Sequence, residues 1–266
     1  MSSIDDLLAV MKSLRDPQSG CPWDRAQDML SIAPYTIEEA YEVVEAIETG
    51  SPDEVMDELG DLLFHIIFYA EMASEKGQFD FDEICRHASN KLVRRHPHVF
   101  ADEAAKDADA VAEDWEKMKA REKRESASAD EVGPGLLDDI SQAIPAMKRA
   151  EKLQKRAASV KFDWADSAPV FEKLVEEVEE LGQVISKNEG AQRLEEELGD
   201  IIFSCVNLSR HLKIDAERAL RRSNRKFASR FAHIESELKK SGRSIQQAEQ
   251  QEMETLWEDA KVRPGS

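Results

Sequence analysis

The sequence predicts an all-α protein built from two tandem copies of one helical unit. Apolar side chains recur at helical spacing in several long segments, and no sustained Val/Ile/Thr alternation bounded by turns predicts a strand. Charged residues make up 34% and apolar residues 41% of the 266 residues, a balance typical of a soluble helical protein. Short segments of the first half also recur in the second half in the same order, which indicates a repeat.

The repeat sets the predicted domain organisation. The matching pairs are 37–47 with 175–185, 57–64 with 196–203, 89–96 with 223–231, and 115–119 with 257–261. Between the halves, the segment "REKRESASADEVGPG" (121–135) is charged, then small and polar, and then rich in glycine, which is typical of a linker. We therefore predict an N-terminal unit over 1–122, a linker over 123–135 and a C-terminal unit over 136–266.

Turn and capping residues predict where the central helices of each copy begin and end. Pro34 is typical of a helix start, Gly50 of its end, and Ser51 of the start of the next helix. In the second copy, Ser167 predicts a helix start and Gly190 separates that helix from the next. Two consecutive helices in each copy then carry the acidic motifs.

Charge and cysteine content argue against several classes of protein. The formal charge is −19, whereas a protein that coats nucleic acid presents a basic surface. Cys21, Cys85 and Cys205 form no CxxC motif, which argues against a disulfide framework and for a reducing compartment. The longest apolar run, Leu62–Ala70, is far too short to cross a membrane. We expect a cytoplasmic protein with neither nucleic acid nor membrane as partner.

A stripe of two acids and one further polar residue follows one predicted helix in each copy. Its members are Glu58, Asp61 and His65 in the first copy and Glu197, Asp200 and Ser204 in the second. Apolar side chains flank both sides of each stripe, so the acids are expected beside the core rather than in open water. Buried carboxylates must be paired, protonated or bound to a metal.

The preceding helix of each copy offers further acids at spacings of three, including the pairs Glu39/Glu42 and Glu177/Glu180. Two antiparallel helices can bring four such carboxylates together, and an all-oxygen set suits Mg²⁺ or Mn²⁺. A Glu-rich helix alone is more often a solvated face, but EExxE followed by ExxD in both halves favours the metal site. A di-iron bundle needs Glu-x-x-His pairs, and neither ExxD motif ends in His.

Basic residues concentrate on the helix that follows each ExxD helix. Lys91 and Arg95 share a face in the first copy, as do Lys226 and Arg230 in the second. These side chains either hold phosphates or form a solvated basic face. No P-loop and no GxGxxG motif occurs, so a Walker or Rossmann nucleotide site is not supported. Trp257 either stacks on a base or anchors a terminal helix by packing.

The combined motifs resemble the MazG family of nucleoside triphosphate pyrophosphohydrolases. The segments that carry the resemblance are "CPWDRAQ" (21–27), "EEAYEVVEAI" (38–47), "DELGDLLF" (57–64), "RRHPHVF" (94–100), "KLQKRAA" (152–158), "FDW" (162–164), "EEELGDIIF" (195–203) and "NLSRHL" (207–212). They extend over nearly the whole chain and include its tandem arrangement. Lys161 is a departure, because a Gly is expected before "FDW", and it can alter a turn.

The resemblance implies a fold and a reaction. The fold is all-α, with four-helix bundles completed by dimerisation. The reaction is Mg²⁺-dependent hydrolysis of NTPs and dNTPs between the α- and β-phosphates, which yields a monophosphate and pyrophosphate. In such relatives the C-terminal copy is the main catalytic one, although the first copy here keeps its own acids.

The resemblance also implies roles for residues of this sequence. The metal role falls on Glu177, Glu180, Glu197 and Asp200, with first-copy equivalents Glu39, Glu42, Glu58 and Asp61. Nucleotide contacts fall on Arg193, Lys226, Arg230 and Trp257, with Lys91 and Arg95 as first-copy candidates. Glu176 and Glu196, which adjoin the predicted ligands, are candidates for the general base.

Two other hypotheses fit the same residues. The first is a non-catalytic helical module that senses Mg²⁺-nucleotide and binds a partner protein, since binding and hydrolysis need the same ligands. The second is a purely structural acidic dimer, for which metal would not change stability. Release of pyrophosphate distinguishes an enzyme from both.

Overall fold

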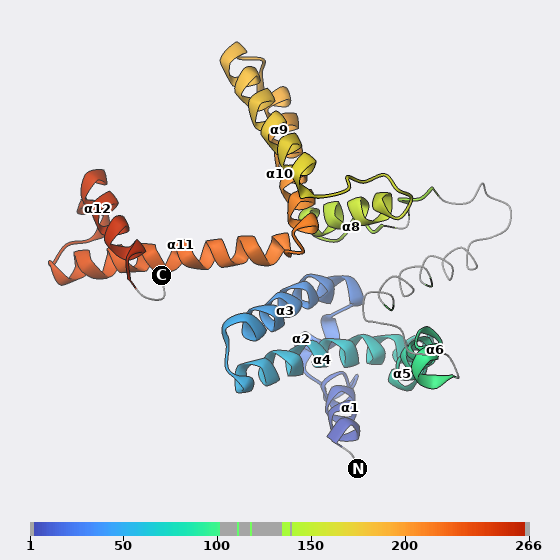
Figure 1. The fold of residues 1–266 in the computed structure, drawn as a ribbon. Coiled ribbons are helices and arrows are strands. Elements are labelled where there is room, and N and C mark those ends of the chain that lie inside the picture. Colours follow the sequence, from blue (N-terminus) through green and yellow to red (C-terminus); the bar gives the residue numbers. More distant parts are fainter. Residues whose placement is uncertain (1–2, 102–110, 112–117, 119–134, 139, 264–266) are drawn as a thin grey trace. The chain divides into compact units, whose positions relative to one another are not determined.

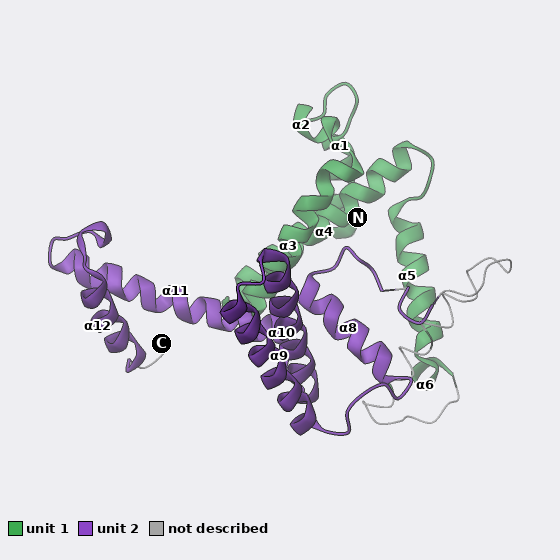
Figure 2. Ribbon diagram, turned by 90° about the horizontal axis from the view of Figure 1, so that it is seen from above, with its two compact units in different colours: residues 1–121 green, residues 122–266 purple. Residues whose placement is uncertain are grey.

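The computed structural model describes residues 3–101, 111, 118, 135–138 and 140–263, and every regular element within them is a helix (Figure 1). The predicted all-α class is therefore confirmed. The chain divides into two compact units, residues 1–121 and 122–266 (Figure 2). Of the predicted linker, 123–135, only Gly135 lies within the described residues, so its structure stays a prediction.

The helices of both units are bounded as follows. In unit 1 they are α1 (Ser3–Leu14), α2 (Pro22–Ala26), α3 (Met29–Thr49), α4 (Pro52–Glu75), α5 (Phe81–Arg95) and α6 (Pro97–Phe100). In unit 2 they are α8 (Ala146–Ala158), α9 (Ser167–Lys187), α10 (Ala191–His211), α11 (Ala216–Lys240), η1 (Ile245–Gln247) and α12 (Gln250–Lys261). Among these helices, none has a stretch long and apolar enough to span a bilayer.

Helix α3 begins earlier than the sequence predicts. Its N-cap is Asp28, whose carboxylate accepts a hydrogen bond from the backbone N–H of Ser31 at 2.8 Å. The prediction that Pro34 starts this helix is wrong, because Pro34 lies inside α3. The capping interaction and the burial of Ile32, which is 1% exposed, stabilise a helical turn ahead of the proline.

The other predicted boundaries of the central helices are confirmed. Gly50 ends α3, and the Ser51 hydroxyl accepts a hydrogen bond from the backbone N–H of Glu54 to start α4. In unit 2, α9 begins at Ser167. Gly190 precedes α10 with φ +95°, a conformation that glycine adopts without strain. Each copy therefore contains an antiparallel helical hairpin, α3–α4 or α9–α10.

The core of unit 1 joins α1 to the hairpin α3–α4. Its buried cluster consists of Met11, Ile32, Ile67, Phe68 and Met72. At the edge of this cluster, Arg15 forms an ion pair with Glu75 and donates to the carbonyl oxygen of Asp24. These contacts tie α1 and the segment that follows it to the far end of α4.

Unit 2 surrounds its hairpin differently. Helix α8 packs on α10, and the Gln154 side chain donates to the carbonyl oxygen of Phe203 at 2.9 Å. Helix α12 packs mainly on α11 (Figure 1). The ring centres of Phe227 on α11 and Trp257 on α12 are 5.2 Å apart. The hairpin α9–α10 therefore keeps much of its own surface uncovered within unit 2.

Candidate functional site

The hairpin α9–α10 brings three acidic side chains together near the middle of its two helices. One carboxylate oxygen from each of Glu177, Glu197 and Asp200 lies within 4.8 Å of the other two. Glu177 and Glu197 are only 6% and 4% exposed. Carboxylates so deeply buried need compensating charge, because desolvation of an unpaired anion is costly.

Lys173 supplies part of this charge from the same helix. Its Nζ lies 2.8 Å from carboxylate oxygens of both Glu176 and Glu177, one turn further along α9. The hydrogen bonds to Glu176 and then to Glu177 raise the pKa of Lys173 above its ordinary value. The lysine therefore stays positively charged beside the acidic group.

Arg193 has the corresponding position on α10. It pairs with the buried Glu197, and its Nη1 lies 2.6 Å from Glu196. This hydrogen bond lowers the pKa of the exposed Glu196 carboxyl. In this arrangement Glu196 is ionised but a weaker proton acceptor than a free glutamate.

The first copy forms a similar acidic group without such cations. One oxygen from each of Glu39, Glu42 and Glu58 lies within 4.8 Å of the others, and no described Lys or Arg pairs with them. Oε2 of Glu39 is buried without a hydrogen-bond partner. Burial, and then the charges of Asp61, Glu42 and Glu58, raise the pKa of Glu39.

Both donor sets fit a hard divalent cation. They contain only carboxylate oxygens, the ligands preferred by Mg²⁺ and Mn²⁺, and the first leaves a buried oxygen without a partner. Each group contains three of the four acids predicted for its copy. Glu180 and Asp61 lie outside them, so their metal role stays a prediction.

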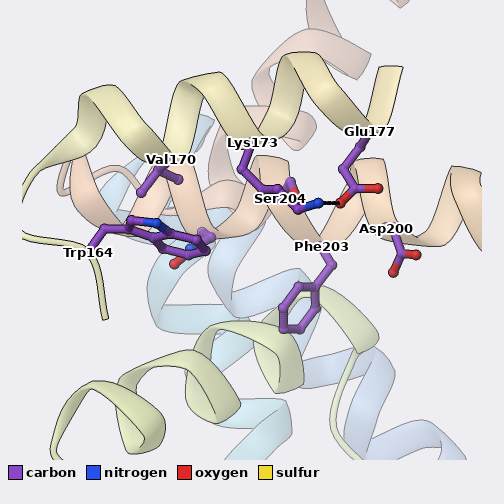
Figure 3. A pocket seen from close by; sticks show the side chains of 8 residues that line it. Trp164, Val170, Lys173, Glu177, Asp200, Phe203 and Ser204 are labelled. Carbon is purple, nitrogen blue, oxygen red and sulfur yellow. Dashed lines mark ion pairs between the residues drawn. The ribbon is translucent and has the colours of Figure 1, made fainter. Parts of the chain in front are cut away.

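A cavity of ≈ 160 Å³ adjoins the acidic group of unit 2 (Figure 3). It is lined by Trp164, Val170, Lys173, Glu177, Asp200, Phe203, Ser204 and Asn207. Figure 3 shows Glu177 and Asp200 at one end and Trp164 with Val170 at the other. One end is therefore charged, and the other is largely apolar.

The equivalent positions of unit 1 carry larger side chains. The repeat aligns Phe68 with Asn207 and His65 with Ser204. Phe68 is fully buried in the core cluster, and His65 is 6% exposed. The two hairpins therefore share their acidic groups but differ in the side chains beside them.

Comparison with known proteins identifies the family of this chain. The model of the MazG nucleotide pyrophosphohydrolase domain matches twice, over residues 27–100 and 167–235. The chain belongs to this family. Each matched segment contains one acidic hairpin, so the MazG repeat and the two carboxylate groups coincide.

Curated relatives match this chain over all or part of its length. The chain is 45% identical to the nucleoside triphosphate pyrophosphohydrolase of Escherichia coli K12 over 98% of both chains. It is 40% identical to a Thermotoga maritima protein named nucleoside triphosphate pyrophosphohydrolase/pyrophosphatase MazG, over 97% of this chain and 95% of that one. A Mycobacterium tuberculosis nucleoside triphosphate pyrophosphohydrolase is 36% identical over 57% of this chain and 44% of its own length.

Of the residues predicted to contact nucleotide, Arg193 pairs with Glu197 of the acidic group, whereas the others lie apart from that group. Lys226 and Arg230 are on α11, and the Arg230 guanidinium carbon lies 5.7 Å from the ring centre of Trp257 on α12. None of the three lines the cavity. In the first copy, Lys91 and Arg95 lie on α5. Helix α5 follows the C-terminal end of α4, whereas Glu58 lies near the N-terminal end of α4. The nucleotide role of these five residues, and that of Arg193, stays a prediction.

Sequence reasoning missed several residues that line the site. Lys173 precedes Glu176 and Glu177 by three and four positions, a spacing that predicts ion pairs on a helix. Asn207 follows Asp200 by seven positions and so continues the acidic stripe by two turns. Both signals are present in the sequence, but neither shows that a cavity lies beside the stripe.

Proposed function

We propose that this chain is a Mg²⁺-dependent nucleoside triphosphate pyrophosphohydrolase. It hydrolyses NTPs and dNTPs between the α- and β-phosphates and releases a nucleoside monophosphate and pyrophosphate. The observation that carries the proposal is the group of Glu177, Glu197 and Asp200, whose two glutamates are buried; cations flank it and a cavity adjoins it. The printed names of the full-length relatives support the same reaction.

The acidic group would hold the metal. Glu177, Glu197 and Asp200 supply oxygen ligands, and Glu180, one turn further along α9, is the proposed fourth. Mg²⁺ is proposed as the natural ion, and Mn²⁺ suits the same donors. A divalent cation in such a site neutralises phosphate charge and lowers the pKa of water.

The chain's own side chains then bind the triphosphate and move a proton. Lys173 and Arg193 stand at the edge of the acidic group, where they would bind phosphate oxygens. Glu176 or Glu196 would accept the proton of the attacking water as its oxygen bonds to phosphorus. If water bonds to the α-phosphorus, the bond from that phosphorus to the α,β-bridging oxygen breaks, and pyrophosphate leaves with the bridging oxygen.

We also propose that two copies of the chain form a homodimer through the hairpin α9–α10. The exposed apolar residues of these helices include Phe171, Val175, Val178, Ile185, Leu194, Leu198 and Ile202. On each helix they recur at spacings of three, four or seven, which places them in one stripe. Two such hairpins would cover each other as a four-helix bundle.

The dimer would also complete the nucleotide site. Lys226, Arg230 and Trp257 do not line the cavity of their own chain. We propose that they contact the triphosphate held by the partner's hairpin, so that each site takes its acids from one chain and Lys226, Arg230 and Trp257 from the other.

The first test is pyrophosphate release with Mg²⁺ from a panel of NTPs and dNTPs. We compare the wild type with Glu197→Gln and with Glu58→Gln, the matched change in the first copy. Glu197→Gln is expected to lower kcat roughly 100-fold or more, because it removes a charged ligand, whereas Glu58→Gln keeps most activity. Nucleotide binding by the wild type without any release would instead support the nucleotide-sensing module that binds a partner protein.

A further inference from the structure

The side-chain amide of Asn207 is held in one orientation at the floor of the cavity. Nε and Nη2 of Arg210 both donate to its Oδ1, at 3.1 and 2.7 Å. A guanidinium has donors only, so the amide must turn its oxygen toward Arg210 and its Nδ2 group away. Asn207 is 6% exposed, and its Nδ2 group donates to no described residue. The largely buried Asn207 side chain, which lines the cavity, therefore has a donor group that pairs with no described acceptor.

Arg210 is itself fixed by Asp163. Its Nη1 and Nη2 donate to the two carboxylate oxygens at 2.8 and 2.5 Å, and Nε2 of His211 lies 3.0 Å from the same carboxylate. Asp163 directly precedes Trp164, which forms one wall of the cavity. The pair Asp163–Arg210 thus positions both the amide and the indole ring.

The cavity runs from charged to neutral along the hairpin. Asn207 lies seven residues beyond Asp200 on α10, which corresponds to a rise of about 10 Å. On the antiparallel α9, Val170 lies beside Trp164 at one end of the cavity, and Glu177 lies near Asp200 at the other end (Figure 3). A cavity of ≈ 160 Å³ is smaller than the sites that enclose whole drug-sized ligands, so it suits one part of a nucleotide.

We propose that the neutral end is the base subsite and that Asn207 selects bases with an oxo group on the edge far from the sugar. This inference rests on the proposed function. When the phosphates lie at the acidic group, the base extends toward Asn207. A pyrimidine then presents its C4 edge to the amide, and a purine presents its C6 edge. An oxo group there accepts a hydrogen bond from Nδ2, whereas an amino group meets it donor to donor.

Trp164 and Val170 complete this subsite. An indole ring offers a flat apolar surface that suits any base, so it contributes affinity without selecting among bases. In the first copy the position of Asn207 is taken by the buried Phe68, which has no donor. Base selection is therefore a property of the second copy.

The test compares kcat/KM of the full chain for two nucleotide pairs, UTP with CTP and ITP with ATP. The members of each pair differ in this group and in the proton of the adjacent ring nitrogen. The wild type is expected to favour the oxo member of each pair roughly tenfold. Asn207→Asp presents acceptors alone and is expected to reverse the preference. Asn188→Asp, the same change at the exposed end of α9, should leave the ratios unchanged.

A second pair of variants tests the positioning role of Arg210. Arg210→Ala frees the amide to rotate, so the ratio of kcat/KM for the oxo nucleotide to that for the amino nucleotide should fall toward one. Arg210→Lys keeps a donor and should retain part of the preference. A purely structural role would lower the rates of all four nucleotides equally. Thermal melting by circular dichroism identifies any variant that does not fold.

The outcomes separate this inference from the proposed function. Hydrolysis of all four nucleotides with ratios that Asn207→Asp does not change would overturn the base assignment and leave the enzyme activity intact. No hydrolysis by the wild type would overturn the proposed function. In that case, equilibrium binding of the same four nucleotides to wild type and Asn207→Asp tests the subsite directly.

Discussion

At the scale of residues, the two acidic groups differ in how their charge is balanced. In unit 2, Lys173 and Arg193 pair with the two buried glutamates. In unit 1, Glu39 has a buried oxygen without a partner and a raised pKa. A buried anion without a counter-charge destabilises the fold, so the first group depends more on a bound cation.

The first prediction concerns Glu39 without metal. Its pKa is raised in the folded state, so protonation favours folding, and stability rises as pH falls from neutral through that raised pKa. With a chelator at pH 7, Glu39→Gln should slow hydrogen exchange of the α3 and α4 amides. The gain in stability of Glu39→Gln over the wild type should shrink toward pH 5, because Glu39 of the wild type becomes protonated. The gain should disappear with Mg²⁺, because Gln is a poorer metal ligand than Glu.

Glu38→Gln is the matched control for this experiment. Glu38 is the exposed neighbour on α3 and lies outside the acidic group. An equal effect of Glu38→Gln would show that general charge reduction, rather than the buried carboxylate, is responsible.

The second prediction concerns the ion pair that positions the cavity wall. The hydrogen bond from Arg210, the largest effect, helps lower the pKa of Asp163 to about 2. A depressed pKa means that this stabilisation is present above the ordinary carboxyl pKa and is lost as pH falls toward 2. Asp163→Asn should destabilise unit 2 at pH 7 by about 1 kcal/mol, after allowance for solvent screening.

Urea denaturation at several pH values tests this sign. The difference between wild type and Asp163→Asn should narrow as pH falls from 4 toward 3. A difference that stays constant over this range would show that the Asp163 charge does not contribute to stability.

At the scale of elements, the two hairpins have the same frame and different interiors. Each consists of two antiparallel helices with acids at equivalent positions. In α3–α4 the positions beyond the acids are filled by Ile32 and Phe68, which pack with Met11 of α1. In α9–α10 the corresponding Asn207 lines a cavity. Core side chains therefore fill these positions in α3–α4, whereas α9–α10 has a cavity that can hold part of a ligand.

The third prediction follows from this contrast. Phe68→Ala removes a fully buried ring and should destabilise unit 1 by about 3–5 kcal/mol. Asn207→Ala removes only the acceptor of a hydrogen-bonded arginine and should destabilise unit 2 by about 1 kcal/mol. Hydrogen exchange of the α4 and α10 amides measures the two units separately. Equal losses would contradict the assignment of these side chains to core and cavity.

At the scale of the whole molecule, the proposed dimer accounts for the separation of the hairpin acids from the cations of α11. Glu197 belongs to the hairpin group, whereas Lys226 and Arg230 lie on α11, which extends to α12 (Figure 1). A trans site predicts that each chain supplies acids to one site and cations to the other. Light scattering should accordingly report a dimer in solution.

The fourth prediction is recovery of activity on mixing two inactive variants. Glu197→Gln and the double variant Lys226→Ala/Arg230→Ala should each be inactive alone. After subunit exchange, each mixed dimer has one intact site, so the mixture should recover about a quarter of wild-type activity. A mixture that stays inactive, although its subunits exchange, would place acids and cations of each site in the same chain.

Several features of this protein could be predicted from the sequence because they depend on local patterns. Helical periodicity predicted the all-α class, and the spacing of EExxE and ExxD predicted acids on facing helices. Capping residues located most ends of the central helices, since a cap acts within one turn. The prediction that the helix starts at Pro34 was wrong, because the Asp28 cap and the burial of Ile32 stabilise a helical turn before the proline.

Only the tertiary structure decided which of these residues meet. Glu177, Glu197 and Asp200 come together while Glu180 does not, because this depends on the distance between two packed helices. The free donor of Asn207 depends on Arg210, whose orientation is set by Asp163, 47 residues away in the chain. Sequence by itself determined the kind of helix and its chemistry; contacts between helices determined the site, because they are set by packing between segments that are distant in sequence.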